Sequence, residues 1–200
     1  MQVLNAADAR HLLVRTGFTP SEIELQAFVG VASEAAVDRI LTAARQNKTT
    51  EPLPAFITAS AFKPQRELSQ EERQEQRRAQ ILEGVSLKQW WLWEMLTTKN
   101  PLAERMTLFW HNHFATSQQK VVRSMAMWHQ HQLLRTNALG SFANMLRGIV
   151  VDPAMLIYLD NANSRQGAPN ENLARELLEL FTLGEATTSK AYSEADIKEA

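Results

Sequence analysis

The 200-residue sequence contains no cysteine, which excludes disulfide bonds, thiol catalysis and zinc or iron–sulfur sites built on thiolates. Both the cytoplasm and the periplasm stay open as compartments. The sequence also has no large excess of positive or negative residues, because 21 basic and 22 acidic residues give a net charge of −1. No whole-chain field therefore attracts nucleic acid or an anionic membrane.

Long apolar runs are also absent. No stretch approaches the ~20 residues that a membrane-spanning helix needs. The opening MQVLNAADARHLLVRTG has neither a basic leader followed by an apolar block nor a small-residue cleavage site. We therefore expect no transmembrane segment and no signal peptide in this chain. In the run SQEERQEQRRAQ, glutamates offset Arg73, Arg77 and Arg78, so we expect no nucleic-acid partner.

Helical periodicity dominates what is present, and no stretch shows sustained strand alternation with hairpin turns. We predict an all-α fold, a multi-helix bundle of about eight or more helices with no substantial sheet. The expected helices cover residues 6–15, 20–29, 33–46, 69–98, 101–116, 121–140, 141–150, 153–160 and 170–184, and another begins at Ser193. Capping residues start several of them: Asn5, Ser69 with Glu72, Asn100 before Pro101, and Asp152 before Pro153.

The chain divides by composition. We expect a single helical domain over 1–200, with a possible small helical subdomain at 1–45, a linker at 46–68 and a main bundle at 69–200. The linker breaks the helical pattern with three prolines, yet Phe56, Ile57 and Phe62 predict that it packs on the body. Because the helix beginning at Ser193 has little room before Ala200, we expect the chain to be the N-terminal part of a longer protein.

Aromatic residues and histidines concentrate in the middle of the chain. The run WWLW, residues 90–93, predicts a helix segment buried on more than one side. In the next helix His113 shares an apolar arc with Phe109 and Trp110, whereas His111 points about 160° away. These two histidines cannot share a metal on one helix. His113 is predicted to be a core histidine, and an acid–base or ligand role is the alternative.

The segment NENLARELLELFTLG, Asn170 to Gly184, predicts one amphipathic helix with Asn170 as its N-cap and Gly184 as its C-cap. Its apolar side is expected to hold Leu173, Ala174, Leu177, Leu178, Leu180 and Phe181. The polar side carries what we call the carboxylate face: Glu171, Glu176 and Glu179. Arg175 and Asn172 lie on the same side.

Two interpretations of the carboxylate face stay open. Glu176 and Glu179 are three residues apart, so together with His113 they are candidate catalytic residues, able to supply a general acid and an ionised base. The same oxygens suit a hard cation such as Ca²⁺ or Mg²⁺, although the sequence demonstrates no cofactor or metal. Alternatively, Arg175 lies four residues from both Glu171 and Glu179 and forms ordinary surface ion pairs.

Five segments occur in an order that resembles a known family. They are RHLLVRTGF (10–18), RMTLFWHNHFATS (105–117), DPAMLIYLDNANS (152–164), NENLARELLELFTLG (170–184) and YSEADIKEA (192–200). The chain is similar to the N-terminal portion of the bacterial domain-of-unknown-function family 1800 (DUF1800). The resemblance implies an all-helical bacterial protein, exported or envelope-associated, and names no reaction.

The family's polar signature, carried over by position, supplies the candidate binding residues. They are Arg105, His111, Asn112, Asp160, Asn163, Asn170, Glu171, Asn172 and Arg175, with Asn161 beside them and with His113, Glu176 and Glu179 as the candidate catalytic set. We expect either a scaffold or interaction module of the cell envelope or, alternatively, a hydrolase or hard-cation-binding protein that uses the carboxylate face. The expected partner is another protein or the missing C-terminal part of the chain itself.

Overall fold

The computed structural model describes residues 2–46, 54–57, 63–165, 170–184 and 192–199, and these residues are almost entirely helical. The helices are α1 (Ala6–Thr16), α2 (Glu22–Gln26), α3 (Ser33–Gln46), α4 (Gln70–Thr97), α5 (Pro101–His113), α6 (Gln118–Val121), α7 (Ser124–Asn137), α8 (Phe142–Val150), α9 (Pro153–Tyr158), α10 (Asn172–Glu176) and α11 (Glu194–Glu199). Short turns η1 (Gln65–Glu67) and η2 (Asn161–Asn163) and the π-helical segment η3 (Leu177–Thr182) complete them. The all-α prediction is confirmed: the described residues form no strand, and an isolated β-bridge joins Val3 and Ala32.

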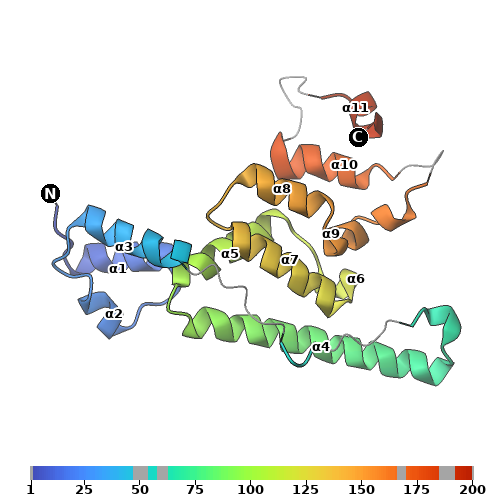
Figure 1. Cartoon of the computed structure of the whole chain (residues 1–200), viewed down its shortest axis with the longest axis horizontal. Coiled ribbons are helices and arrows are strands. Elements are labelled where there is room, and N and C mark those ends of the chain that lie inside the picture. The colour runs from blue at the N-terminus through green and yellow to red at the C-terminus, as the bar shows by residue number, and fades with distance from the viewer. Residues whose placement is uncertain (1, 47–53, 58–62, 166–169, 185–191, 200) are drawn as a thin grey trace.

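The first three helices pack around a small core of their own at one end of the molecule (Figure 1). Asn5 caps α1 as predicted, because its Oδ1 accepts hydrogen bonds from the backbone N–H groups of Ala7 and Asp8. The predicted start of the second helix at Pro20 is wrong. Ser21 is its N-cap and forms a capping box with Glu24, so α2 begins at Glu22. The core of this part consists of Leu4, Ala9, Leu25, Phe28 and Ala36.

The expected linker is described at residues 54–57 and 63–68, and Phe62 lies outside the described residues. Within the described part, Ile57 and Leu68 are buried and Phe56 is half-buried. Apolar side chains of this stretch are thus withdrawn from water. The division of the chain into subdomain, linker and bundle stays a prediction.

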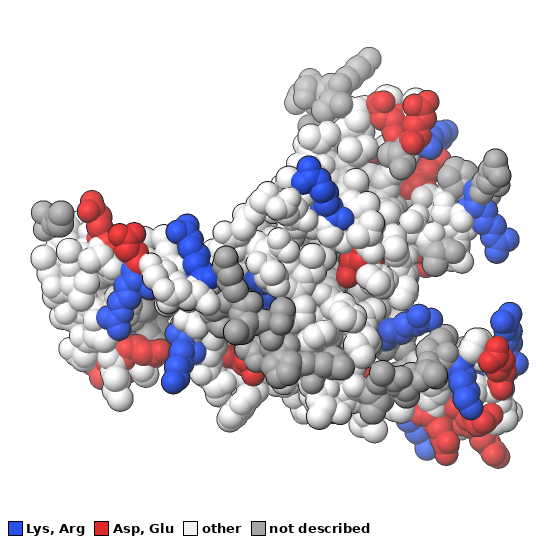
Figure 2. Space-filling view, in the orientation of Figure 1, with Lys and Arg blue, Asp and Glu red and all other residues white. Residues whose placement is uncertain are grey.

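Helix α4 is 28 residues long and runs along one edge of the molecule (Figure 1). The predicted capping box at its start is confirmed: Ser69 Oγ accepts from Glu72 N, and Glu72 Oε2 accepts from Ser69 N. Figure 2 shows charges of both signs gathered at this N-terminal end of α4. In the C-terminal half, the predicted burial on several sides is wrong, because Trp93 is 64% exposed whereas Trp90 and Trp91 are half-buried.

The main core lies between α5, α7, α8, α9 and η3. Its buried members are Phe114, Leu134, Met145, Ile149, Met155, Leu159 and Phe181. Gly148 on α8 lets α7 approach closely, because a Cβ at that position would lie 2.5 Å from Leu133 Cδ1. Loop 117–120 was predicted to be irregular, but most of it forms the short helix α6, and the following helix starts at Ser124 rather than Val121.

The segment 170–184 departs from a uniform α-helix. After five α-helical residues the chain widens into the π-helical η3, so the backbone bonds span five residues rather than four. The expected apolar side therefore rotates, and Leu180, predicted to lie in the core, is 60% exposed while Phe181 is buried. Gly184 ends the segment with φ of 82°, as the C-cap prediction requires.

Candidate functional site

A buried ion pair fixes the relative positions of α5 and α7. Glu104 is 1% exposed and accepts a 2.6 Å hydrogen bond from Arg135 Nε, and Arg135 is 8% exposed. The second carboxylate oxygen of Glu104 accepts from Trp91 Nε1 of α4 at 3.1 Å. Both oxygens of one buried carboxylate thus bind neighbouring helices, and Trp91 is held in a fixed orientation.

Two histidines from different helices meet beside this pair. The ring of His111 in α5 lies 5.6 Å from the ring of His131 in α7, centroid to centroid, with an angle of 24° between the planes. Trp91 packs on both, at 4.6 Å from His111 and 4.8 Å from His131. Trp90 meets His131 edge-on at 5.4 Å. Four aromatic rings from three helices therefore form one cluster.

The cluster lines a pocket of about 240 Å³, which we call the histidine pocket. Its walls are Leu87, Lys88, Trp90, Trp91, Leu108, His111, Asn112, Thr116, Gln118, Met127 and His131. Three polar atoms of the wall are buried and have no hydrogen-bond partner among the described residues: His111 Nε2, His131 Nδ1 and Gln118 Oε1. The amide nitrogen of Gln118, by contrast, donates to Val122 O and to Ser124 Oγ.

Burial keeps both imidazoles neutral. It lowers the pKa of His111 to about 4. For His131 burial lowers the pKa well below 6.5, and the nearby charges of His111 and Arg135 lower it further. At pH 7 each ring therefore offers one N–H donor and one lone-pair acceptor.

A chain of hydrogen bonds holds the adjoining wall. Thr116 Oγ1 donates to Gln130 Oε1 at 2.5 Å, and Gln130 Nε2 donates to Asp152 Oδ2 at 2.9 Å. The same Asp152 oxygen accepts from Met155 N and so caps α9, as the sequence predicted. Burial raises the pKa of Asp152. The Thr116 side chain at the pocket wall is thus fixed by a buried, fully connected set of polar groups.

The carboxylate face lies elsewhere, on α10 and η3, and it is organised around Arg175. This guanidinium binds both carboxylate oxygens of Glu194, at 2.9 and 3.0 Å, and lies 3.4 Å from Glu171 Oε2 and 3.5 Å from Glu179 Oε1. Hydrogen bonding to Arg175 lowers the pKa of Glu194. The two ion pairs expected from four-residue spacing are present, and Glu194 was not foreseen.

The remaining predicted residues do not converge on one place. His113 is half-buried among aromatic rings and its Nε2–H donates to Phe181 O at 3.0 Å. Asn112 reaches the histidine pocket, whereas Arg105 donates to Gly17 O and so ties α5 to the start of the chain. Asp160 pairs with Lys120 Nζ at 2.7 Å.

The polar loop before α10 is mainly structural. Asn170 Nδ2 donates to the carbonyls of Leu159 and Asp160, and its Oδ1 accepts from Asn172 N. The prediction of Asn170 as the N-cap is wrong, because α10 begins at Asn172 and its N-cap residue is Glu171, whose side chain makes no capping hydrogen bond. The side chains of Asn163 and Asn172 are exposed. Among the described residues, no group of three or more His, Asp or Glu side chains is arranged to hold a metal ion.

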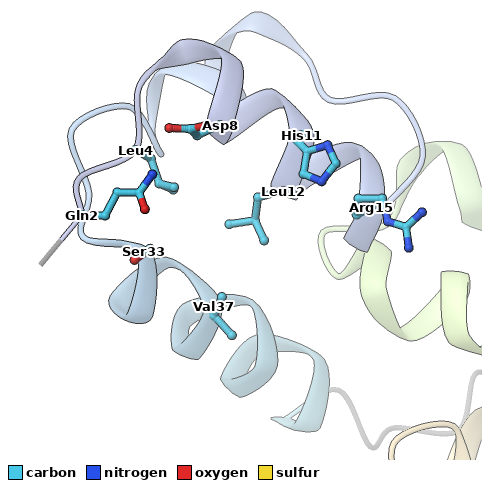
Figure 3. Close-up of a pocket in the computed structure, with 8 residues that line it drawn as sticks. All are labelled: Gln2, Leu4, Asp8, His11, Leu12, Arg15, Ser33 and Val37. Carbon is cyan, nitrogen blue, oxygen red and sulfur yellow. The ribbon is translucent and has the colours of Figure 1, made fainter.

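A second hollow lies between α1 and α3 (Figure 3). It measures about 430 Å³, and Figure 3 shows Leu12 of α1 and Val37 of α3 facing each other across it, with Asp8, His11 and Arg15 along α1. The side chains of His11 and Arg15 are exposed, and that of Asp8 is half-buried. None of their polar atoms is buried without a hydrogen-bond partner. This hollow is an open groove, and the histidine pocket is the more developed site.

Sequence reasoning missed the histidine pocket because each histidine was compared only with its neighbour two residues away. His111 and His113 were predicted to face apart on one helix, and by the same spacing His129 and His131 also face apart. The pairing that forms is between α5 and α7. The adjacent tryptophans at 90 and 91 were the available clue, since two large rings on one helix face need several partners.

Fold and site together define the class of the protein: an all-helical domain with an aromatic pocket that contains two buried neutral histidines. The chain belongs to the family described as Protein of unknown function (DUF1800), whose sequence profile matches residues 11–200. Comparison with curated proteins and with solved structures finds no match.

Proposed function

We propose that this protein is a helical interaction module of the cell envelope that binds a partner protein along α4. The observation that carries the proposal is an exposed apolar strip, the outer face of α4, formed by Ile81, Leu82, Val85, Leu92, Trp93 and Leu96. Each of these side chains is between 45% and 71% exposed. At about 100° per residue they fall within an arc of about 120°.

The opposite side of α4 is already occupied. Trp90 and Trp91 line the histidine pocket, and a Cβ at Gly84 would lie 2.9 Å from Gln118 Nε2. The helix therefore has two apolar sides, of which one packs on the bundle and the other faces water. An exposed apolar strip of this kind, here interrupted by the exposed Gln89, is typical of a surface that binds another protein. The i, i+4, i+11, i+15 spacing of Ile81, Val85, Leu92 and Leu96 suits an amphipathic helix of the partner.

The envelope assignment rests on family membership, because the DUF1800 resemblance implies exported or envelope-associated proteins. Within the described residues no helix combines the length and the apolar character that crossing a bilayer requires. Attachment to the envelope through a partner bound on α4 is consistent with that finding.

Photo-cross-linking in the producing cells tests the proposal. A photoreactive residue replaces Trp93 on the outer face of α4, and a matched variant carries the same residue at Gln74, which is exposed on the charged half of the helix. We expect one adduct of defined mass from position 93 and none from position 74. Leu92→Glu is expected to remove the adduct while the protein stays folded. Equal labelling at both positions, or none at 93, would contradict the proposal.

The second candidate function is hydrolysis or hard-cation binding at the carboxylate face, with Glu176, Glu179 and His113 as the active residues. The observation in its favour is Glu176, which is half-buried and has no ion pair among the described residues, in contrast to Glu171 and Glu179. Half-buried carboxylates next to an ionised group are suited to acid–base work and to Ca²⁺ or Mg²⁺.

Calorimetric titration with CaCl₂ and MgCl₂, together with elemental analysis of the purified protein, tests this candidate. The test variant is Glu176→Gln, and Glu75→Gln on the exposed side of α4 is the control. Metal uptake that Glu176→Gln abolishes and Glu75→Gln retains would support the site. Absence of uptake in the wild-type protein would remove the cation-binding version.

A further inference from the structure

The histidine pocket contains an unusual concentration of unsatisfied polar atoms. His111 Nε2, His131 Nδ1 and Gln118 Oε1 are all buried, and all belong to residues of its wall. Leaving a buried polar atom unpaired costs about 1–3 kcal/mol, so native proteins keep such atoms rare. The other such atoms among the described residues belong to Trp128 and Gln132, and neither residue lines this pocket.

Several polar groups close to the pocket are, by contrast, paired. Glu104 binds Arg135 and Trp91 through both oxygens, and Gln130 joins Thr116 to Asp152. Three of the six buried unpaired atoms among the described residues thus belong to the wall of one pocket. Their common position on one pocket wall points to hydrogen bonds made to a molecule inside it.

The charges around the pocket select the class of that molecule. The ammonium-bearing Lys88 belongs to the wall, so a cation in the pocket meets a like charge. A carboxylate has no N–H or O–H group to donate, so it would leave Gln118 Oε1 without a partner. A neutral ligand meets neither obstacle.

The aromatic wall and the volume of the histidine pocket restrict the class of ligand further. The tryptophan and histidine rings of the wall pack on one another at 4.6 to 5.6 Å, and an aromatic wall favours an aromatic ligand. A pocket of about 240 Å³ holds a single ring with one polar substituent. Gln118 Oε1 requires an N–H or O–H donor, and the imidazoles bind either a donor or an acceptor.

We propose that the histidine pocket binds an uncharged planar molecule of the aromatic amide or nitrogen heterocycle class, hydrogen-bonded to Gln118, His111 and His131. This binding site is separate from the outer face of α4 and does not depend on the function proposed for that helix. The amide N–H₂ of the ligand would donate to Gln118 Oε1, and its carbonyl would accept from an imidazole N–H.

Three probes of the same shape and different charge test this assignment: benzamide, benzamidinium and benzoate. Binding is followed at pH 7 by the NMR shifts of the tryptophan indole N–H signals. We expect benzamide to bind with a Kd of about 1 mM, a reasonable affinity for so small a ligand, and both ions to bind at least roughly tenfold more weakly. Unchanged indole signals with benzamide, or tightest binding by either ion, would overturn the proposal.

Variants distinguish a binding role from a structural one. His131→Phe keeps a flat ring and removes the unpaired nitrogens, so we expect benzamide affinity to fall roughly tenfold while thermal stability is kept or increased. His129→Phe, two residues away on the exposed side of α7, is the control and should leave affinity unchanged. Gln118→Met removes the acceptor and should have the same effect on binding as His131→Phe. Full benzamide affinity in both pocket variants would contradict the proposal.

Discussion

Two arginines in this protein bind carboxylates in opposite surroundings. Among the described residues Arg135 pairs with one carboxylate, that of Glu104, and both side chains are almost entirely buried. Arg175 contacts three carboxylates, those of Glu171, Glu179 and Glu194, but all four groups are partly exposed to solvent. Water screens the second set and not the first, so the number of partners says little about the strength of the interaction. Burial decides it.

The same contrast separates the two candidate sites. At the carboxylate face, acidic side chains are satisfied by Arg175 and by solvent. In the histidine pocket, polar atoms are removed from water and left without partners among the described residues. An unsatisfied polar atom is a stronger indication of ligand binding than a row of acidic residues on a helix surface.

The largest expected effect comes from breaking the buried ion pair. Arg135→Met leaves the Glu104 carboxylate buried with Trp91 as its remaining described partner, and we expect the free energy of unfolding to fall by about 3–5 kcal/mol. Urea denaturation followed by tryptophan fluorescence measures it. The double variant Glu104→Leu/Arg135→Met removes both charges and should recover most of the loss. Additive losses in the double variant would show that the pair itself is not the cause.

The histidines make stability depend on pH. The pKa of His111 is about 4 in the folded protein and near 6.5 in the unfolded chain, so the unfolded chain binds the proton first. The stabilisation is complete above pH 6.5 and is lost as the pH falls towards 4, to a limit of about 3 kcal/mol. We expect His111→Phe to flatten this part of the stability profile. Equal profiles for wild type and His111→Phe would refute the assignment.

A smaller loss is expected at the buried cap of α9. Asp152→Ala removes the acceptor for both Gln130 Nε2 and Met155 N, and we expect a cost of about 2 kcal/mol in urea denaturation. Ser141→Ala removes the exposed cap of α8 and is the matched control. It should cost less, because solvent replaces the lost hydrogen bond.

The smallest effect is expected at the carboxylate face. If the face is solvated, Glu176→Gln changes the free energy of unfolding by less than ~0.5 kcal/mol, and Arg175→Gln has no measurable effect in 0.5 M NaCl. If Glu176→Gln lowered the free energy of unfolding as much as Arg135→Met does, the carboxylate face and the buried ion pair would not differ in the way that burial predicts.

Local chemistry made much of the fold predictable. The caps at Asn5, Ser69 and Asp152 and the end at Gly184 depend on residues within a few positions of one another, and the structure has all of them. Asn100 shows the limit, because α5 does begin at Pro101 but the Asn100 side chain makes no capping hydrogen bond. The Asn-Pro pair thus predicts where the helix begins but not whether the asparagine side chain forms the capping hydrogen bond.

Contacts between distant parts of the chain were not predictable in this way. His111 and His131, Glu104 and Arg135, and Gln130 and Asp152 are each separated by about twenty residues or more, so no helical periodicity relates them. The π-helical turn after Glu176 was missed for a similar reason, since an i to i+5 backbone pattern has no side-chain periodicity in so short a segment. The sequence thus identified the helices, whereas their packing determined the pocket.

The most direct measurement is the titration of the histidine side chains by NMR, with the His111 and His131 signals assigned by their loss in His111→Phe and His131→Phe. Since the account requires both rings to be buried and neutral, His111 should titrate at about pH 4 and His131 well below 6.5. Benzamide should shift both signals at pH 7. Titration of both rings at the ordinary value near 6.5 would show that the pocket is open to water and would contradict the account.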